Sequence, residues 1–315
     1  MKLLIVRNDR MGDLLMSLPA VREVRSAFPY ARLTLLVRKG LEPLLQPHPD
    51  LDHLWVWDPA QGQGFGAILR WGFRFRREHF DAALILNPTR LFHAASFLAG
   101  IPIRAGYRRK WGFLLNRAVP DTKSARDLHE SEYNLEIVRL LGIPSREPVL
   151  SLPERSEADQ EARRILESRG VPFSVRPVAL HPWTSNPVKG WPMESFRELA
   201  GRLVRSGQTI LWIGEPEGKD FHPPESSQGI NLTGQVPLRL LPALLRCCAV
   251  LVSNDSGPVH VAAAVGTPVV VVAPETHARL LARWRPLGNG HRLLLSPGVE
   301  EVAAAASSAA AQGER

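Results

Sequence analysis

The stretch RNDRMGD, residues 7–13, gathers two acids and two arginines directly after an apolar run. Residues 3–6 read as a buried strand and residues 14–16 begin a helical pattern, so the charged residues lie in a strand-to-helix loop. In open α/β sheets, ligands bind at the carboxyl ends of such strands. A carboxylate in that place, such as that of Asp13, can accept the proton of an attacking hydroxyl group.

Asp13 also has a plainer interpretation as the N-cap of the following helix. Aspartate commonly caps helices by accepting hydrogen bonds from backbone N–H groups, here those of Leu15 or Met16. A dinucleotide-binding loop fits less well, because phosphates need a glycine-rich turn and this loop has one glycine, Gly12. Position alone therefore leaves capping and acid–base chemistry both open for Asp13.

A second loop with suitable chemistry follows the apolar run at residues 250–252. A turn leads from it into a short helix over 259–265, with Pro258 at the first helical position and Gly266 as the stop. The start of a helix offers amide donors to an anion such as a diphosphate. Asp255 fits either this site or a cap. The candidate residues are Asp255, Ser256, Gly257 and His260.

Two further loops follow strand-like runs in the second half of the chain. The loop after residues 178–180 carries hydroxyl groups and an ammonium group, which are typical phosphate ligands, on Thr184, Ser185 and Lys189. The loop after residues 209–213 begins at Gly214. Its acids, Glu215 and Glu217, can accept hydrogen bonds from ribose hydroxyls.

The elements that must hold these loops alternate between apolar strands and helical patterns, which predicts parallel sheets with crossover helices. Prolines punctuate residues 144–153, and a charged helix over 158–169 follows. We therefore predict an α/β protein with two Rossmann-like parallel-sheet domains, residues 1–152 and 153–315, facing an interdomain cleft. The predicted strands are 3–6, 33–37, 54–57, 82–86, 178–180, 209–213, 250–252 and 269–272, and a last helix continues from residue 299.

Composition indicates a globular protein with a basic surface. Hydrophobic residues make up 44% and charged residues 22%, and the formal net charge of +8 favours an anionic partner. Cys247 and Cys248 are adjacent and are the only cysteines, which fits a reducing compartment better than a disulfide framework. The N-terminal apolar run is too short for a signal peptide, and no run is long enough to span a membrane. We therefore expect a cytoplasmic protein.

Arginines and aromatic residues alternate over residues 70–77. This pattern suits a surface that faces lipid or nucleic acid, but it is more often the end of an amphipathic helix with solvated arginines. The residues concerned are Arg70, Trp71, Phe73, Arg74, Phe75, Arg76 and Arg77.

Other classes of protein fit the sequence less well. Asp50 and Asp52 have the D-x-D spacing of some metal-dependent glycosyltransferases, but they precede a predicted strand and read as loop residues. No cluster of histidines and cysteines suggests zinc. A nucleic-acid-binding protein is motivated by the basic charge alone, without a recognisable motif. A dehydrogenase or epimerase would need the missing G-x-G-x-x-G loop.

Three motifs, in this order and spacing, make the chain resemble the family 9 glycosyltransferases, the ADP-heptose:lipopolysaccharide heptosyltransferases. They are VRNDRMGDLLMSLPAVREVR, HPWTSNPVKGWPMESFRELA and SNDSGPVHVAAAVGTPVV, and the similarity extends over nearly the whole chain, including DLHESEYNLEIVRLLGI. The resemblance implies a GT-B fold, with the acceptor bound mainly by the N-terminal domain and the nucleotide sugar by the C-terminal one. It also implies inversion at the anomeric carbon, with no essential metal and no cofactor.

The resemblance further implies roles for the residues that match these motifs. Asp13 matches the catalytic base, and Arg7 and Gly12 beside it lie where the family approaches the sugar donor. The diphosphate loop is matched by Thr184, Ser185 and Lys189, and Glu217 is our choice for the acid that binds ribose. The D-[ST]-G-x-x-H nucleotide-sugar motif is matched by Asp255, Ser256, Gly257 and His260.

The partners that the resemblance implies are ADP-heptose as donor and a lipid-linked, lipopolysaccharide-type glycan as acceptor. Such an acceptor implies peripheral contact with the cytoplasmic face of the inner membrane, and no specific nucleic acid is expected. The segment APETHARLL, residues 273–281, departs from the G-P-T-x-P-like loop of many members, which leaves the donor's base and sugar open. The alternatives are another nucleotide sugar with another glycan acceptor, or a basic, non-catalytic protein that binds nucleotides or nucleic acids.

Overall fold

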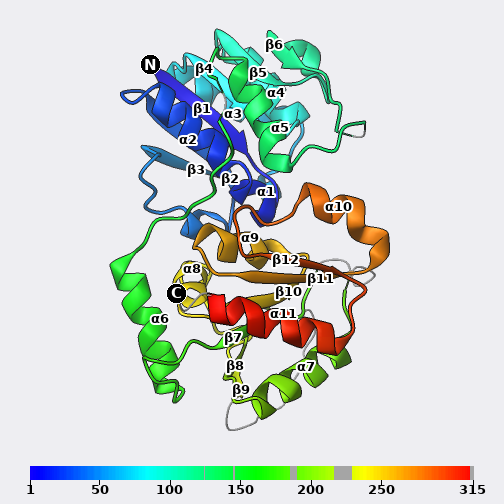
Figure 1. The fold of residues 1–315 in the computed structure, drawn as a ribbon. Coiled ribbons are helices and arrows are strands. Elements are labelled where there is room, and N and C mark those ends of the chain that lie inside the picture. Colours follow the sequence, from blue (N-terminus) through cyan, green and yellow to red (C-terminus); the bar gives the residue numbers. More distant parts are fainter. Residues whose placement is uncertain (124, 145, 185–189, 216–228, 313–315) are drawn as a thin grey trace. The chain divides into compact units, whose positions relative to one another are not determined.

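The chain forms two compact units, Met1–Val149 and Leu150–Arg315, each described by itself below. The computed structural model describes residues 1–315 except 124, 145, 185–189, 216–228 and 313–315. Each unit contains a six-stranded parallel sheet with helices packed on it (Figure 1). Parallel neighbours need a crossover connection, so helices alternate with strands as the sequence predicts.

The sheet of the first unit has the strand order β3-β2-β1-β4-β5-β6. Central β1 pairs with β2 on one side and with β4 on the other. Residues 3–6 are all buried, as a continuous apolar run predicts for a strand covered on both faces. The strands are β1 (Lys2–Arg7), β2 (Arg32–Arg38), β3 (His53–Trp57), β4 (Ala82–Ile85), β5 (Ile103–Tyr107) and β6 (Arg117–Val119).

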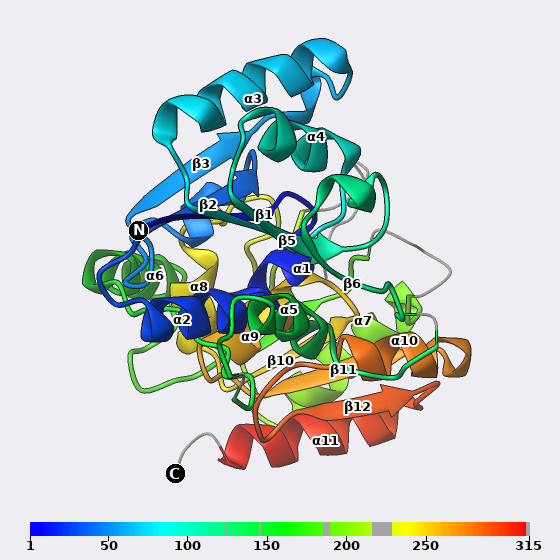
Figure 2. The same ribbon diagram turned by 90° about the horizontal axis from the view of Figure 1, so that it is seen from above.

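Two pairs of helices cover the faces of this sheet. α2 contacts α5 on one face, and α3 contacts α4 on the other (Figure 2). Beneath α3 and α4 the core is aromatic, with stacked and edge contacts among Trp55, Trp57, Trp71, Phe75, Phe80 and Phe92. The helices are α1 (Met11–Leu15), α2 (Leu18–Ala27), α3 (Phe65–Glu78), α4 (Arg90–Leu98) and α5 (Glu130–Arg139), with short 3₁₀ turns η1 (Glu42–Leu44), η2 (Pro59–Gln61) and η3 (Gly112–Leu114).

The sheet of the second unit has the order β12-β11-β10-β7-β8-β9, with β10 paired to β11 and β7. Its strands are β7 (Val178–His181), β8 (Ile210–Trp212), β9 (Gly229–Asn231), β10 (Val250–Asn254), β11 (Val269–Ala273) and β12 (Arg292–Leu295). Its helices are α6 (Ser156–Ser168), α7 (Met193–Arg205), α8 (Leu241–Arg246), α9 (Gly257–Ala264), α10 (Ala278–Arg283) and α11 (Val299–Gln312), with the 3₁₀ turn η5 (Glu275–His277).

The predicted C-terminal helix is confirmed as α11, which contacts α7, β10 and β11. Its alanines explain why it packs so closely on them. Val302, Ala306 and Ala309 are buried in the core of the second unit, where small side chains let the helix backbone approach its neighbours.

All eight predicted strands are confirmed, and four strands were missed. β6, β9 and β12 lie at sheet edges, and β6 and β9 have three residues each, so their sequences need little apolar character. β5 is interior but reads IRAGY, where an arginine and a glycine interrupt the apolar run.

The segment between the units packs on the second one. The units divide after Val149, three residues before the predicted boundary at 152. Leu152 is buried, and its N–H donates to the carbonyl of Ala264 (2.8 Å). Arg246 donates to the carbonyls of Leu152 (3.3 Å) and Pro153 (2.7 Å). These contacts make the predicted linker part of the second unit's body.

Candidate active site

Each sheet has a switch point, where the connections leave neighbouring strands in opposite directions. In the first unit it lies between β1 and β4, and in the second between β7 and β10. Ligands of open α/β sheets bind beyond the carboxyl ends of the strands at such a point. The loop of Asp13 follows β1 and the loop of Ser256 follows β10, so each candidate motif lies at the switch point of its own unit.

Arg7, the last residue of β1, is the centre of the cluster in the first unit. Its side chain is 2% exposed. It donates hydrogen bonds to Asp9 Oδ1 (2.9 Å), Asp13 Oδ1 (2.9 Å), Glu130 Oε1 (3.4 Å), Asn134 Oδ1 (3.0 Å) and the Leu86 carbonyl (3.3 Å). The fixed fork of a guanidinium suits several acceptors at once. These acceptors hold the guanidinium in place, so Arg7 has the geometry of a positioning residue for Asp13. Its expected place near the sugar donor stays a prediction.

The interpretation of Asp13 as an N-cap is wrong. α1 begins at Met11 with Arg10 as its N-cap, and Asp13 is the third residue of the helix. Met16 N–H donates to the Gly12 carbonyl (2.9 Å). The physical reason is competition, because a charge-assisted bond from the buried guanidinium is stronger than one from a neutral amide. The Asp13 side chain is 22% exposed, which leaves it accessible to a substrate.

Helix α5 completes this cluster with two residues, Glu130 and Asn134, that no sequence pattern connects with Arg7. A capping box fixes its start, since His129 N–H donates to Glu132 (2.7 Å) and Ser131 N–H donates to His129 Nδ1 (3.3 Å). Glu130 in the first turn and Asn134 one turn later both contact Arg7. The one available signal was their i, i+4 spacing in a helix whose other buried residues are mostly apolar.

A second cation balances the acids of the cluster. Lys123 Nζ donates to Glu130 Oε1 (2.8 Å) and lies 5.0 Å from the ring centre of Tyr107 and 5.1 Å from that of Tyr133. Burial raises the pKa of Tyr107, which keeps the phenol neutral. Sequence analysis did not predict that Lys123 belongs to this cluster, because no local sequence pattern connects it with residues 7–13.

The charges of this cluster act strongly on one another. Burial opposes the charge of Arg7, but Asp9, Asp13 and Glu130 outweigh it and hold the pKa of Arg7 above its ordinary value. Burial raises the pKa of Asp9 to about 6, against the attraction of Arg7 and with repulsion from Asp13 and Glu130. Asp9 therefore takes up a proton in mildly acidic solution beside the candidate base.

The start of α9 is the centre of the cluster in the second unit. Ser256 is its N-cap, Gly257 its first residue, and Gly266 follows it with φ 81°, as predicted for a helix stop. The cap interpretation of Asp255 is wrong, because Asp255 precedes the N-cap and its Oδ2 lies 3.2 Å from His277 Nε2. His260 is 3% exposed within α9, so a contact with phosphate stays a prediction.

Neutral polar groups connect the ends of β7 and β10. His181 Nδ1 lies 3.1 Å from Ser253 Oγ and 3.2 Å from Ser256 Oγ. Burial lowers the pKa of His181 to about 4, so the ring is neutral at physiological pH. Asn254 accepts from Trp191 N–H (2.8 Å) and donates to the Pro182 carbonyl, which ties the loop after β7 to the end of β10. The sequence assigned no role to His181 or Asn254.

Gly214, after β8, is required by this packing. Its φ is 123°, and a Cβ there would lie 2.7 Å from His181 Cδ2 and 2.8 Å from Trp183 Cε3. A side chain is therefore excluded both by backbone conformation and by space.

Several predicted residues lie outside the described part of the chain. Thr184 is described and half-buried. Ser185, Lys189 and Glu217 lie outside the described residues, so their assignments stay predictions.

Asp50 and Asp52 are loop residues, as the sequence indicates. Asp52 accepts from Arg25 (2.6 Å) and from Leu33 N–H (2.7 Å), and it lies at the amino end of β3, away from the carboxyl edge. Burial opposes ionisation, but these bonds lower the pKa of Asp52. Among the described residues, no group of three or more His, Cys, Asp or Glu side chains could hold a metal ion.

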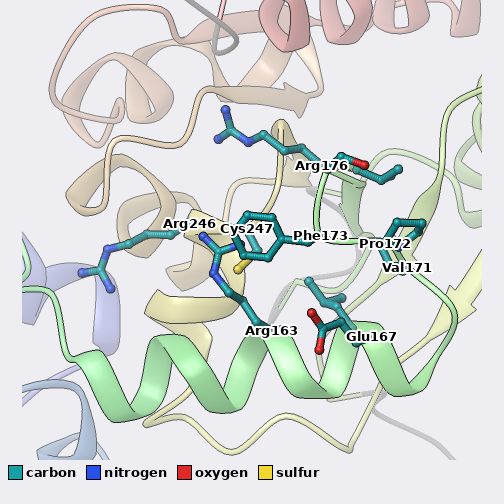
Figure 3. A pocket seen from close by; sticks show the side chains of 11 residues that line it. Arg163, Glu167, Val171, Pro172, Phe173, Arg176, Arg246 and Cys247 are labelled. Carbon is teal, nitrogen blue, oxygen red and sulfur yellow. The ribbon is translucent and has the colours of Figure 1, made fainter.

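A cavity of about 250 Å³ lies near the amino ends of β7 and β10, whereas the cluster at α9 lies at their carboxyl ends (Figure 3). Its walls come from α6 and from the segments that precede β7 and β10. The Arg163 guanidinium lies 4.2 Å from the ring centre of Phe173, whereas that of Arg246 turns away to Asp159 (2.9 Å). Burial raises the pKa of Cys247, so this thiol is a poor nucleophile. The cavity is separate from the cluster at α9.

Comparison with known proteins decides the family. The model of glycosyltransferase family 9 (heptosyltransferase) matches residues 68–302, well over half of the chain. The chain belongs to glycosyltransferase family 9. This family 9 enzyme is 25% identical over 293 residues to lipopolysaccharide heptosyltransferase 2 of Salmonella typhimurium, covering 86% of this chain and 82% of the relative. It is 25% identical to the lipopolysaccharide core heptosyltransferase OpsX of Haemophilus influenzae, covering 85% and 77%.

Solved structures show that this family 9 glycosyltransferase has the GT-B fold. The structure of Escherichia coli ADP-heptose lps heptosyltransferase II aligns with a TM-score of 0.83 at 21% identity, covering all of both chains. A family 9 glycosyltransferase from Veillonella parvula gives a TM-score of 0.84 at 20% identity, covering 99% of this chain and 97% of that one. The predicted α/β fold with two Rossmann-like parallel-sheet domains is confirmed.

Proposed function

We propose that this glycosyltransferase moves a heptose from ADP-heptose to a lipopolysaccharide-type glycan, with inversion at the anomeric carbon and without a metal ion. The observation that carries the proposal is the Asp13 carboxylate, held by Arg7 (2.9 Å) at the carboxyl end of β1. The names of the relatives, lipopolysaccharide heptosyltransferases, support the donor and acceptor classes. So does a solved structure of E. coli WaaC with ADP-2-deoxy-2-fluoro heptose.

In the proposed reaction Asp13 is the general base. A hydroxyl oxygen of the acceptor attacks the anomeric carbon as its proton passes to the Asp13 carboxylate. The bond from the anomeric carbon to the diphosphate oxygen breaks, and ADP leaves with the electron pair. Attack opposite the leaving group inverts the anomeric configuration. Arg7 orients Asp13 and lies beside the expected place of the sugar donor.

The second unit would bind the donor and stabilise the leaving diphosphate. The positive end of α9, with the Gly257 amide and the Ser256 hydroxyl, suits the negative charge that develops on the diphosphate. The Lys189 ammonium and the hydroxyls of Thr184 and Ser185 would add to it, in place of a metal ion. Asp255 and His260 are assigned to the same donor site, and Glu217 to the ribose hydroxyls.

The test is a transfer assay with a panel of nucleotide sugars and lipopolysaccharide-type acceptors truncated at successive core sugars. We expect nucleoside diphosphate release with ADP-heptose, an inverted anomeric signal in the NMR spectrum of the product, and the same rate in excess EDTA. Transfer from another nucleotide sugar alone would replace the donor assignment. Loss of transfer in EDTA with rescue by Mg²⁺ or Mn²⁺ would contradict the metal-independent mechanism.

A further inference from the structure

The positive charge of the chain is concentrated in one segment of the first unit. Residues 65–117 contain ten Lys and Arg and two acids, so this segment alone carries +8, equal to the formal net charge of the whole chain. The same segment holds six of the twelve large hydrophobic side chains that are exposed among the described residues. Exposed apolar groups and positive charge therefore coincide there.

Three elements of this segment lie side by side over one face of the sheet. α3 contacts α4, and α4 contacts the loop around η3 (Figure 2). A Cβ on Gly72 of α3 would lie 2.7 Å from Leu98 of α4, so the two helices are closely packed. His93 of α4 binds the Lys110 carbonyl of the η3 loop through Nδ1 (2.9 Å). The outer side of these elements is therefore one continuous layer, which we call the α3–α4 surface.

Aromatic rings project from each of the three elements. Phe73 of α3 is 62% exposed, Phe97 of α4 54% and Phe113 of η3 78%. Trp111, in the turn before η3, is also exposed, and its φ of 67° is unusual for a bulky residue. Large apolar side chains gathered on one side of a folded unit usually mark an interaction surface.

Arginines are interleaved with these rings. The Arg104 guanidinium lies 5.4 Å from the ring centre of Phe97, and that of Arg90 lies 5.9 Å from Trp111. Arg76 and Arg77, in the last turn of α3, are exposed. Long basic side chains can keep their charge at the level of lipid headgroups while their methylene stems lie along apolar surface.

We propose that the α3–α4 surface binds the headgroup region of a bilayer rich in anionic lipid. Positive charge attracts such a bilayer, and exposed aromatic rings insert at the boundary between headgroups and acyl chains. Among the described residues, none of the helices has the length and apolar character needed to span a bilayer. The proposal does not rest on the chemistry of transfer.

A lipid surface explains the α3–α4 surface better than other occupants. A second copy of the same surface would bring two strongly positive layers together, which like-charge repulsion opposes. A nucleic acid would use the arginines, but it gives no reason to expose an aliphatic side chain such as Leu98, which is 42% exposed.

The test is sedimentation of the full chain with vesicles, without donor or acceptor. Vesicles contain phosphatidylcholine alone or with 30% phosphatidylglycerol. We expect binding to the anionic vesicles only, weakened by salt. Each arginine near an anionic surface contributes about fivefold, so R76Q/R77Q should weaken the partition coefficient about 25-fold. F73A/F97A should weaken it at least tenfold, since burying each ring is favourable.

Matched controls use equally exposed residues elsewhere in the chain. R22Q/R205Q removes the same charge, and Y30A/F173A removes two exposed rings, so both should bind like the wild type.

Absence of vesicle binding by the wild type at low salt overturns the proposal, as does an equal loss in the control variants. Suppose that R76Q/R77Q weakens vesicle binding, that F73A/F97A does not, and that the wild type binds an oligonucleotide as tightly as anionic vesicles. The surface would then be a general polyanion-binding surface. Light scattering that shows dimers abolished by F97A would assign the surface to a second copy. Either outcome rejects the lipid assignment while leaving the transferase activity unaffected.

Discussion

The two units place different chemistry at equivalent points of their sheets. At the switch point of the first unit, three carboxylates and one amide surround a buried guanidinium, and a lysine adds a second positive charge. At the switch point of the second unit, the central groups are a neutral histidine, two hydroxyls, an asparagine and the start of a helix. Ionised groups hold the first cluster, whereas neutral groups make the contacts between the ends of β7 and β10 in the second.

Under the proposed function, this difference lets one fold serve acid–base chemistry in one unit and diphosphate binding in the other. A general base must keep its charge and direction, so its neighbours are charged and buried. A dianionic ligand needs donors that do not depend on the state of a titrating side chain, and backbone amides with hydroxyls supply these. The predictions below test this contrast, beginning with the largest expected effect.

Asp13→Asn should retain the fold and lose transfer. The Asn Oδ1 can still accept from Arg7, but it cannot take a proton, so turnover should fall by about 10²–10⁴. Steady-state rates with ADP-heptose and the melting temperature check both parts. Asp9→Asn is the matched control, because it removes another carboxylate from the same guanidinium and should keep transfer within a few-fold of wild type. The opposite pattern would make Asp9 the base.

Arg7→Lys should impair transfer through Asp13. A single ammonium cannot reproduce the hydrogen bonds of the guanidinium fork, and misplacing a catalytic group by about 1 Å can lower kcat by about 10²-fold. The measurements are kcat, KM for the donor and the pH profile of kcat, which a purely structural defect would not displace. Arg10→Lys, at an exposed neighbouring position, should behave as wild type. A normal kcat with only a lower melting temperature would show that Arg7 serves stability alone.

Ser256→Ala should weaken ADP binding. Loss of one hydrogen bond costs about 0.5–1.5 kcal/mol, or about 2- to 13-fold in affinity, as measured by calorimetry. Ser253→Ala is the control, because Ser253 is fully buried and shares the contact with His181, so it should lower stability but not affinity. Equal affinities of both variants would remove Ser256 from the donor site.

Asp9→Asn should stabilise the protein at neutral pH and not in acid. The pKa of Asp9 is raised from 3.8 to about 6 in the folded protein. The folded state therefore binds the carboxyl proton more tightly than the unfolded state does. As the pH rises from 3.8 through 6, the carboxylate forms and lowers the free energy of unfolding. Removing it should raise the free energy of unfolding by about 1–3 kcal/mol at pH 8. The gain should fade toward pH 4. Melting curves at the two pH values check this, and a gain of the same size at both would contradict it.

Local patterns in the sequence predicted the central strands and the two loops that follow β1 and β10. The N-cap interpretation of Asp13 was wrong, because the capping preference considers only the start of the helix. The Asp13 side chain instead binds Arg7, which is buried at the end of β1. Glu130 and Asn134 were out of reach for a similar reason, since they lie 123 and 127 residues from Arg7 and meet it only when α5 docks. Short edge strands such as β6 were not predicted, because they contain too few apolar residues to form a recognisable strand pattern.

The burial of α9 has a consequence for the timescale on which its amides are exposed. Residues 259–264 are all buried, so this helix is enclosed on all sides rather than lying on a surface. The amides of these six residues can then exchange hydrogen with solvent only when the surrounding core opens, whereas frayed surface helices exchange through small local openings. The donors at its start are thus held in a fixed direction before any ligand arrives, and the entropy of ordering them has already been lost in folding.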